Sequence, residues 1–152
     1  MHDLATDLND NILISYYFQN RIEKYSPIGN LIFKADRQLN FEIAEDERKY
    51  SGETPQGIIE WTSAALTRVS GNIEIDSSNR IWINTYNKPI IDDNFSVEDI
   101  DFEVYNKEGI LLTKVPRPEN SGNFRIFDNK LYFIHDYYIS EYKIIDNDII
   151  GK

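Results

Sequence analysis

The feature that most constrains this chain is a series of short segments in which apolar and polar residues alternate, separated by turn-forming residues. The clearest series lies within residues 71–115. Residues 77–79 and the Asn-Lys-Glu-Gly stretch at 106–109 are its tight turns. The expected strands are residues 72–76, 80–85, 101–105 and 110–115. Alternation with a period of two, bounded by such turns, predicts one four-stranded antiparallel sheet.

Versions of this unit occur before and after it. The first has expected strands at 3–6, 12–17, 21–25 and 31–33, and the third has them at 122–127, 130–135, 139–144 and 148–150. When the second strands are aligned, Ile12, Ile81 and Leu131 coincide, which gives spacings of 69 and 50 residues. The shorter spacing is close to the roughly 40–50 residues of a propeller blade.

The second strand of each unit is almost continuously apolar and is flanked by alternating strands. A strand buried on both faces has this composition, as it would when sheets stack face to face. An isolated four-stranded sheet would leave apolar faces in water, so each unit needs neighbours.

The repeat resembles the NHL-like family of six-bladed β-propellers. The resemblance is carried by residues 73–76, 79–83 and 102–109, and by the Pro-Gln-Gly-Ile turn at 55–58. It implies an all-β, propeller-type fold of three four-stranded antiparallel blades, a half or partial propeller. Within a single module of residues 1–152, the blades would span about 3–35, 71–115 and 122–150, with insertions at 36–70 and 86–100.

Three blades are half of such a ring and would leave the first and third sheets with open apolar faces. Three arrangements are open. The chain is half of a longer propeller, two copies pair as a homodimer that completes six blades, or the sheets pack in another way. Symmetric dimers are the commonest homo-oligomers.

Composition limits the partners. The formal charge of −10 argues against nucleic acid and against an anionic membrane surface, since both select clustered Lys and Arg. The absence of Cys excludes disulfides and thiolate chemistry. The sequence has neither a signal-peptide pattern nor an apolar run of roughly 20 residues, so no membrane span is expected. A portion of an exported bacterial periplasmic or surface protein would have the same features, so the compartment stays open.

The long connections, residues 35–70 and 86–100, fall on the same side of such a fold, whereas the other connections are tight turns. Function gathers on loops held by a rigid scaffold, so this side is the expected binding face. Within the first connection, Ile58, Trp61, Ala65 and Val69 have the spacing of one helix face. Such a helix would be a lid or docking helix, or a cap over an exposed sheet edge.

Acidic residues gather in the second connection. They are Asp92, Asp93, Glu98, Asp99 and Asp101. Calcium takes several oxygen ligands, so Asp92, Asp93 and Asp99 are candidate ligands. The spacing of a known calcium loop is absent, and acidic loops are commonly just solvated.

His135 and Asp136 end the second strand of the third unit, on the side of the long connections. His135 could act as a general base and Asp136 could orient it. Adjacent residues of a strand point to opposite faces, however, which disfavours a bond between them.

Aromatic residues recur at or near the ends of the second strands. Trp82 and Tyr132 are expected in the core between sheets, whereas Tyr17, Tyr86 and Tyr138 are expected at the surface, where they could contact a ligand together with His135.

The pattern therefore favours a non-catalytic binding or assembly scaffold whose partner is a protein, peptide or glycan. The alternative is a lactonase-like propeller hydrolase or lyase that uses a divalent cation. A third possibility is a structural half-ring whose function lies in another half.

Overall fold

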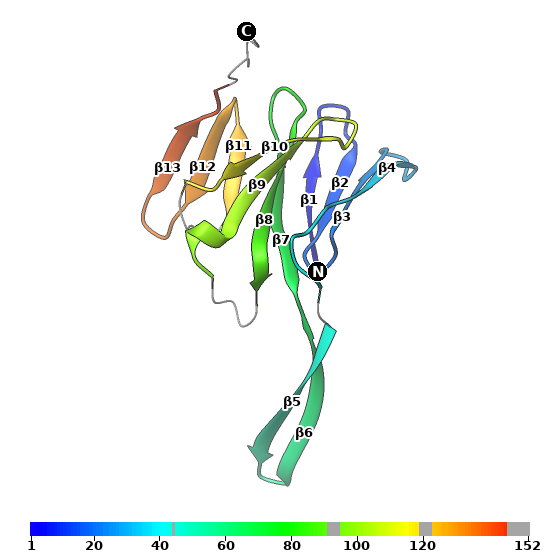
Figure 1. The fold of residues 1–152 in the computed structure, drawn as a ribbon, viewed down its shortest axis with the longest axis vertical. Helices are drawn as coiled ribbons and strands as arrows, with labels where there is room; N and C mark the ends of the chain where they lie inside the picture. Colours follow the sequence, from blue (N-terminus) through cyan, green and yellow to red (C-terminus); the bar gives the residue numbers. More distant parts are fainter. Residues whose placement is uncertain (44, 91–94, 119–122, 146–152) are drawn as a thin grey trace.

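A computed structural model of the chain describes residues 1–43, 45–90, 95–118 and 123–145. It is an all-β structure, as predicted, but it has four antiparallel sheets where three were expected (Figure 1). Outside its strands, the described chain contains one short 3-10 helix, Val97–Asp99, and no α-helix. No helix among the described residues is long and apolar enough to cross a membrane.

Three sheets are simple meanders in chain order. The first sheet contains β1 (His2–Thr6), β2 (Ile12–Tyr16), β3 (Arg21–Tyr25) and β4 (Leu31–Asp36). The second contains β7 (Arg68–Ile75), β8 (Ile81–Ile90), β9 (Ile100–Tyr105) and β10 (Leu111–Pro116). The third contains β11 (Phe124–Phe127), β12 (Lys130–Ile134) and β13 (Ile139–Lys143). The fourth strand expected at 148–150 lies outside the described residues.

The predicted turns form because short polar side chains hold them. One carboxylate oxygen of Asp7, and likewise of Asp76, accepts the backbone N–H groups of the residues two and four positions later. The amide oxygen of Asn106 does the same. Asp128 and Asn129 form a two-residue hairpin turn with φ of 50° and 58°, a conformation that these residue types tolerate.

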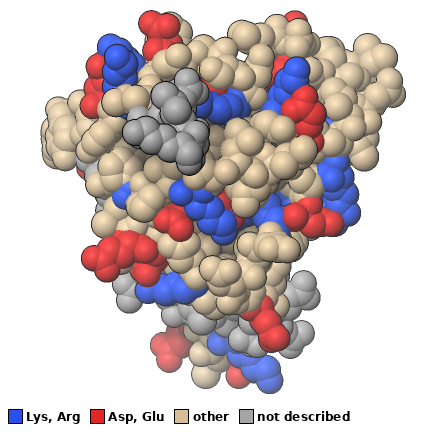
Figure 2. Space-filling model, turned by 45° about the horizontal axis from the view of Figure 1, so that its top comes forward, with Lys and Arg blue, Asp and Glu red and all other residues tan. Residues whose placement is uncertain are grey.

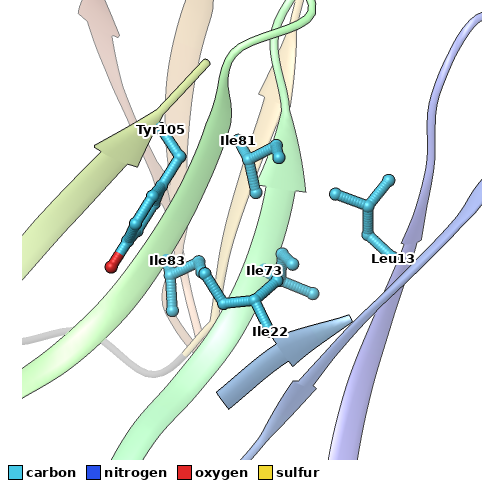
Figure 3. Packing of buried hydrophobic residues seen from close by; sticks show 6 residues of the cluster. All are labelled: Leu13, Ile22, Ile73, Ile81, Ile83 and Tyr105. Carbon is cyan, nitrogen blue, oxygen red and sulfur yellow. The ribbon is translucent and has the colours of Figure 1, made fainter. Parts of the chain in front are cut away.

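The second sheet lies between the other two (Figure 1). On one face, Leu13 and Ile22 of the first sheet pack against a cluster from the second sheet that includes Ile73, Ile83 and Tyr105 (Figure 3). On the other face, a cluster of aromatic and aliphatic side chains joins the second and third sheets. It contains Trp82, Phe102, Val104, Phe124, Leu131 and Phe133. The second strand of the central unit, β8, is therefore covered on both faces near Ile81 and Ile83, as its composition predicted.

The outer faces of the first and third sheets have no sheet packed on them in the described structure, and the sheets do not close into a ring. Leu4 on the first and Ile139 on the third are exposed.

Charged side chains of both signs are interspersed in the view of Figure 2, with no continuous basic patch.

The prediction of a helix around Ile58 and Trp61 is wrong. The segment forms a hairpin of two ten-residue strands, β5 (Glu45–Thr54) and β6 (Gly57–Leu66), and Val69 belongs to β7. Thr54 Oγ1 accepts the backbone N–H of Gln56 and donates to the carbonyl of Gly57, and Gly57 has a φ of 128°. This turn chemistry and the β-branched and aromatic residues of β6 override the helical spacing.

The C-terminal ends of β2, β8 and β12 point to one side of the molecule, and the hairpin extends from that side (Figure 1). We call this the loop side. The connection after β8 starts later than expected, because β8 continues through Ile90.

Candidate functional site

One concave surface on the loop side is a groove at the base of the hairpin. A hollow of about 730 Å³ is lined by Asn20 and by residues 37–43, the segment between β4 and β5. A second hollow of about 520 Å³ shares Asn20 and Ile43 with it and includes Phe18 and Gln19. We call the two together the hairpin groove. Its lining mixes side-chain amides and aromatic and aliphatic groups with the charged side chains of Arg21, Arg37 and Glu42.

Two hydrogen bonds hold the walls of the hairpin groove together. The backbone N–H of Arg37 donates to the carbonyl of Asn20, and the side-chain amide of Asn20 donates back to the carbonyl of Arg37 at 3.0 Å. The β2–β3 turn and the segment after β4 are thereby fixed to each other.

Arg37 lies beneath the groove and is buried. Its Nε donates to Glu103 Oε2 at 2.6 Å, and its Nη2 is 3.5 Å from the carbonyl oxygen of Val69. Lys114 and the hydroxyl of Tyr105 also bind the Glu103 carboxylate, at 2.8 and 2.7 Å. Burial alone would raise the pKa of Glu103, but the Arg37 charge and these hydrogen bonds outweigh it and lower the pKa. Nη1 of Arg37 is buried without a hydrogen-bond partner among the described residues.

The hairpin itself has one apolar face. Tyr50 and Trp61 are directly opposite each other on β5 and β6, and their rings stack with centroids 5.7 Å apart. Gly52 and Ile59 form the next pair on this face, and a Cβ at Gly52 would lie 3.3 Å from the Trp61 ring. Trp61 is 50% exposed, and Ile59 is also exposed, so the hairpin presents an aromatic and aliphatic surface to solvent.

Tyr17 and Tyr86, two of the predicted binding residues, are brought together by Arg68. The Arg68 guanidinium carbon is 4.9 Å from the Tyr17 ring centroid and 5.6 Å from that of Tyr86. The expectation that Tyr86 lies at the surface is wrong, because it is only 5% exposed and packs edge-on against Phe95. Burial, followed by the Asp3 charge, raises the pKa of Tyr17.

His135 and Tyr138 form a second pair. Their rings stack with centroids 4.0 Å apart, and the His135 Nε2 is 3.2 Å from the Ser140 hydroxyl. Both residues belong to the connection between β12 and β13 on the loop side. Asp136, proposed to orient His135, is exposed. Of the two aromatics expected in the core, Trp82 is buried and Tyr132 is half-buried.

The predicted calcium ligands are only partly described. Asp92 and Asp93 lie outside the described residues. Asp99 binds Lys88 at 2.8 Å and accepts the backbone N–H of Ser96, and the Lys88 hydrogen bond is the main cause of its lowered pKa. Over the described ranges, no group of three or more His, Cys, Asp or Glu side chains is placed to hold a metal ion.

Neither known protein families nor curated proteins include a match to this chain. The groove and the hairpin are therefore the features that bear on function. Sequence reasoning missed both. The signal for the hairpin was the Thr-Pro-Gln-Gly turn at 54–57 between two β-prone segments. The groove had no such signal, since it arises where residues 18–21 and 37–43 meet in space.

Proposed function

We propose that this chain is a non-catalytic binding or assembly scaffold of the β-propeller type, with a protein or peptide partner bound on the loop side. The observation that carries the proposal is the exposed apolar face of the β5–β6 hairpin. A two-stranded hairpin is marginally stable in water by itself. Exposed Tyr and Trp side chains are typical of interaction surfaces, where they bury large areas at little entropic cost.

The propeller-type arrangement is supported by three features. Three successive antiparallel meanders stack face to face, equivalent turns have equivalent side-chain hydrogen bonds, and the longer connections emerge on one side. A stack of this kind is a rigid base from which one element can project.

The chemistry of the hairpin groove favours a peptide over a flat or highly charged ligand. Side-chain amides of Asn20, Gln38 and Asn40 can pair with peptide N–H and C=O groups, while Phe41 and Ile43 offer apolar contact. The outward edges of β5 and β6 have no strand partner in the described structure, so an extended segment can also add to the hairpin as a third strand.

The test is selection from a library of random displayed peptides, followed by affinity measurement with variants. Trp61→Ala should weaken binding of the selected peptides at least tenfold, since truncation of an aromatic anchor costs about 2 kcal/mol or more. Ile28→Ala is the matched control. Ile28 is an exposed apolar residue in the turn between β3 and β4, and this turn is on the side opposite the hairpin (Figure 1). Peptides that bind both variants like the unaltered chain would contradict the proposal, as would a library that yields no binder.

A further inference from the structure

The joint between the first and second sheets has a defined chemistry. Ile73, Ile81 and Ile83 of the second sheet are covered by the first sheet. Beside them, Glu103 forms an ion pair with Arg37. Arg37 belongs to the segment immediately after β4, the last strand of the first sheet. The joint thus combines aliphatic contact with one arginine that crosses from the earlier sheet to a carboxylate on the later one.

The outer face of the first sheet repeats the residues with which the second sheet makes this joint. Residues 69 positions apart match along the first two strands, and residues 80 positions apart match along the last two. The pairs are Leu4 with Ile73, Ile12 with Ile81, Ile14 with Ile83, Glu23 with Glu103, Tyr25 with Tyr105, and Lys34 with Lys114.

Strand register confirms that the matched residues occupy equivalent places. Glu23 lies between Ile14 and Lys34 on the neighbouring strands, as Glu103 lies between Ile83 and Lys114. Leu13 and Ile22 of the first sheet pack against the second sheet, so the residues adjacent to them in sequence lie on the opposite, outer face.

This outer face is open, yet it holds a preformed buried carboxylate. Leu4 is 52% exposed, whereas Glu23 is only 8% exposed. The hydroxyls of Tyr16 and Tyr25 donate to Glu23 Oε2 at 2.7 and 2.8 Å, and Arg21 Nη1 is 3.5 Å from Oε1. The first of these hydrogen bonds is the largest contribution to the raised pKa of Tyr16, about 12, and to the lowered pKa of Glu23. Glu103, by contrast, also binds an arginine from outside its own sheet, Arg37 of the segment after β4.

We propose that the outer face of the first sheet is a docking surface for a further four-stranded antiparallel unit that presents an arginine from the segment after its outermost strand. That arginine would bind Glu23 as Arg37 binds Glu103. The joint between the second and third sheets has the same polarity. There Arg117, which follows the outermost strand β10 of the second sheet, packs over the Phe133 ring of the third sheet. This surface is distinct from the hairpin, so the inference does not depend on the hairpin's partner.

A second copy of this chain does not offer the required arginine from its described residues. Arg37 and Arg117, the two arginines that follow an outermost strand, are both buried in joints within their own chain. The occupant that fits is a separate unit that resembles the first sheet. It would pack on the first sheet as the first sheet packs on the second.

The probe for the test is the chain's own first unit. In a tandem variant, residues 1–69 are repeated ahead of Met1, which preserves the 69-residue spacing between the first and second sheets. The rate of thiol labelling at an introduced Cys reports whether the outer face of the first sheet is covered, since the chain has no native Cys. Ile12→Cys in the original copy should be labelled at least tenfold more slowly in the tandem variant than in the unextended chain. Ile28→Cys, at a turn tip that is 84% exposed, should be labelled equally fast in both.

The arginine is tested by a double-mutant cycle in the tandem variant. Glu23→Gln in the original copy and Arg37→Met in the added copy should each lower the Tm by at least about 3 °C, and the double variant should lose little more than either alone. Equal labelling at position 12, or additive losses, would overturn the proposal. Protection at position 12 in the unextended chain that disappears on dilution would also overturn it, because a second copy would then be the occupant. The Trp61→Ala change should alter none of these results, which separates this test from that of the proposed function.

Discussion

The second sheet and the β5–β6 hairpin consist of similar alternating strands but differ in what covers them. The second sheet is covered on both faces, so residues such as Phe102 and Ile83 have no exposed surface. The hairpin has sheets on neither face in the described structure, and its stacked Tyr50 and Trp61 remain in contact with water. The comparison separates two uses of aromatic β-structure. In the second sheet it supplies folding free energy, and in the hairpin it stays exposed, where the proposed partner would bind.

The largest expected effect is in the second sheet. Phe102 is fully buried. Its ring packs against Trp82 of the same sheet and, across the joint, against Phe124 and Phe133 of the third sheet. Phe102→Ala should lower the free energy of unfolding by about 3–5 kcal/mol through lost burial and a cavity. Urea denaturation followed by circular dichroism measures the change. A loss below 1 kcal/mol would mean that the third sheet is not packed on the second.

The next effect is at the joint between the first and second sheets. Arg37→Met leaves the Glu103 carboxylate buried with Lys114 and Tyr105 only, and should lower the free energy of unfolding by about 3 kcal/mol at pH 7. The folded pKa of Glu103 is depressed, so its contribution is present above the unfolded pKa and is lost as the pH falls below it. The penalty of Arg37→Met should therefore shrink in acid. A penalty that is constant from pH 7 to pH 3 would contradict the assigned pair.

A smaller effect is expected at the first turn of the first sheet. Burial would raise the pKa of Asp7, but hydrogen bonds from Lys24, Asn11 and backbone N–H groups outweigh it and lower the pKa from 3.8 to about 2. The stabilisation is present above the unfolded pKa of 3.8 and is lost as the pH falls through the folded pKa of about 2. A shift of this size corresponds to a loss of about 2 kcal/mol at most.

Urea denaturation of the unaltered chain and of Asp7→Asn between pH 5 and pH 2 tests this assignment. The variant should be less stable at pH 5 and should show a flatter acid dependence. Parallel curves for the two proteins would show that Asp7 is not the titrating group.

The same contrast explains what the sequence could reveal. Strands and turns of the three meanders were predictable, because alternation and local side-chain hydrogen bonds, such as those of Asp7 and Asp76, are properties of neighbouring residues. The hairpin was mistaken for a helix, because Ile58, Trp61 and Ala65 fit a helical spacing while their cross-strand partners lie on another segment. Tyr86 was expected at the surface, because nothing local reveals that Phe95 and Ile100 pack around it.

The sequence predicted that long connections gather on one side of the molecule, but it did not predict the groove. Arg37 illustrates the reason. Its place beneath the groove depends on Glu103, which is 66 positions away, and on a reciprocal contact with Asn20. Such long-range pairs become visible only when the sheets are stacked.

The smallest effect on stability should come from the hairpin. Trp61→Ala removes an aromatic ring as large as any in the core, yet the ring is half exposed and contacts chiefly Tyr50 and Gly52. The free energy of unfolding of the whole chain should fall by no more than about 1 kcal/mol, the scale of a cross-strand pair. If Trp61→Ala abolishes peptide binding but lowers the free energy of unfolding only slightly, the Trp61 ring serves to bind the partner. A loss of 3 kcal/mol or more would instead make the hairpin part of the folding core, and the two regions would then differ in shape but not in role.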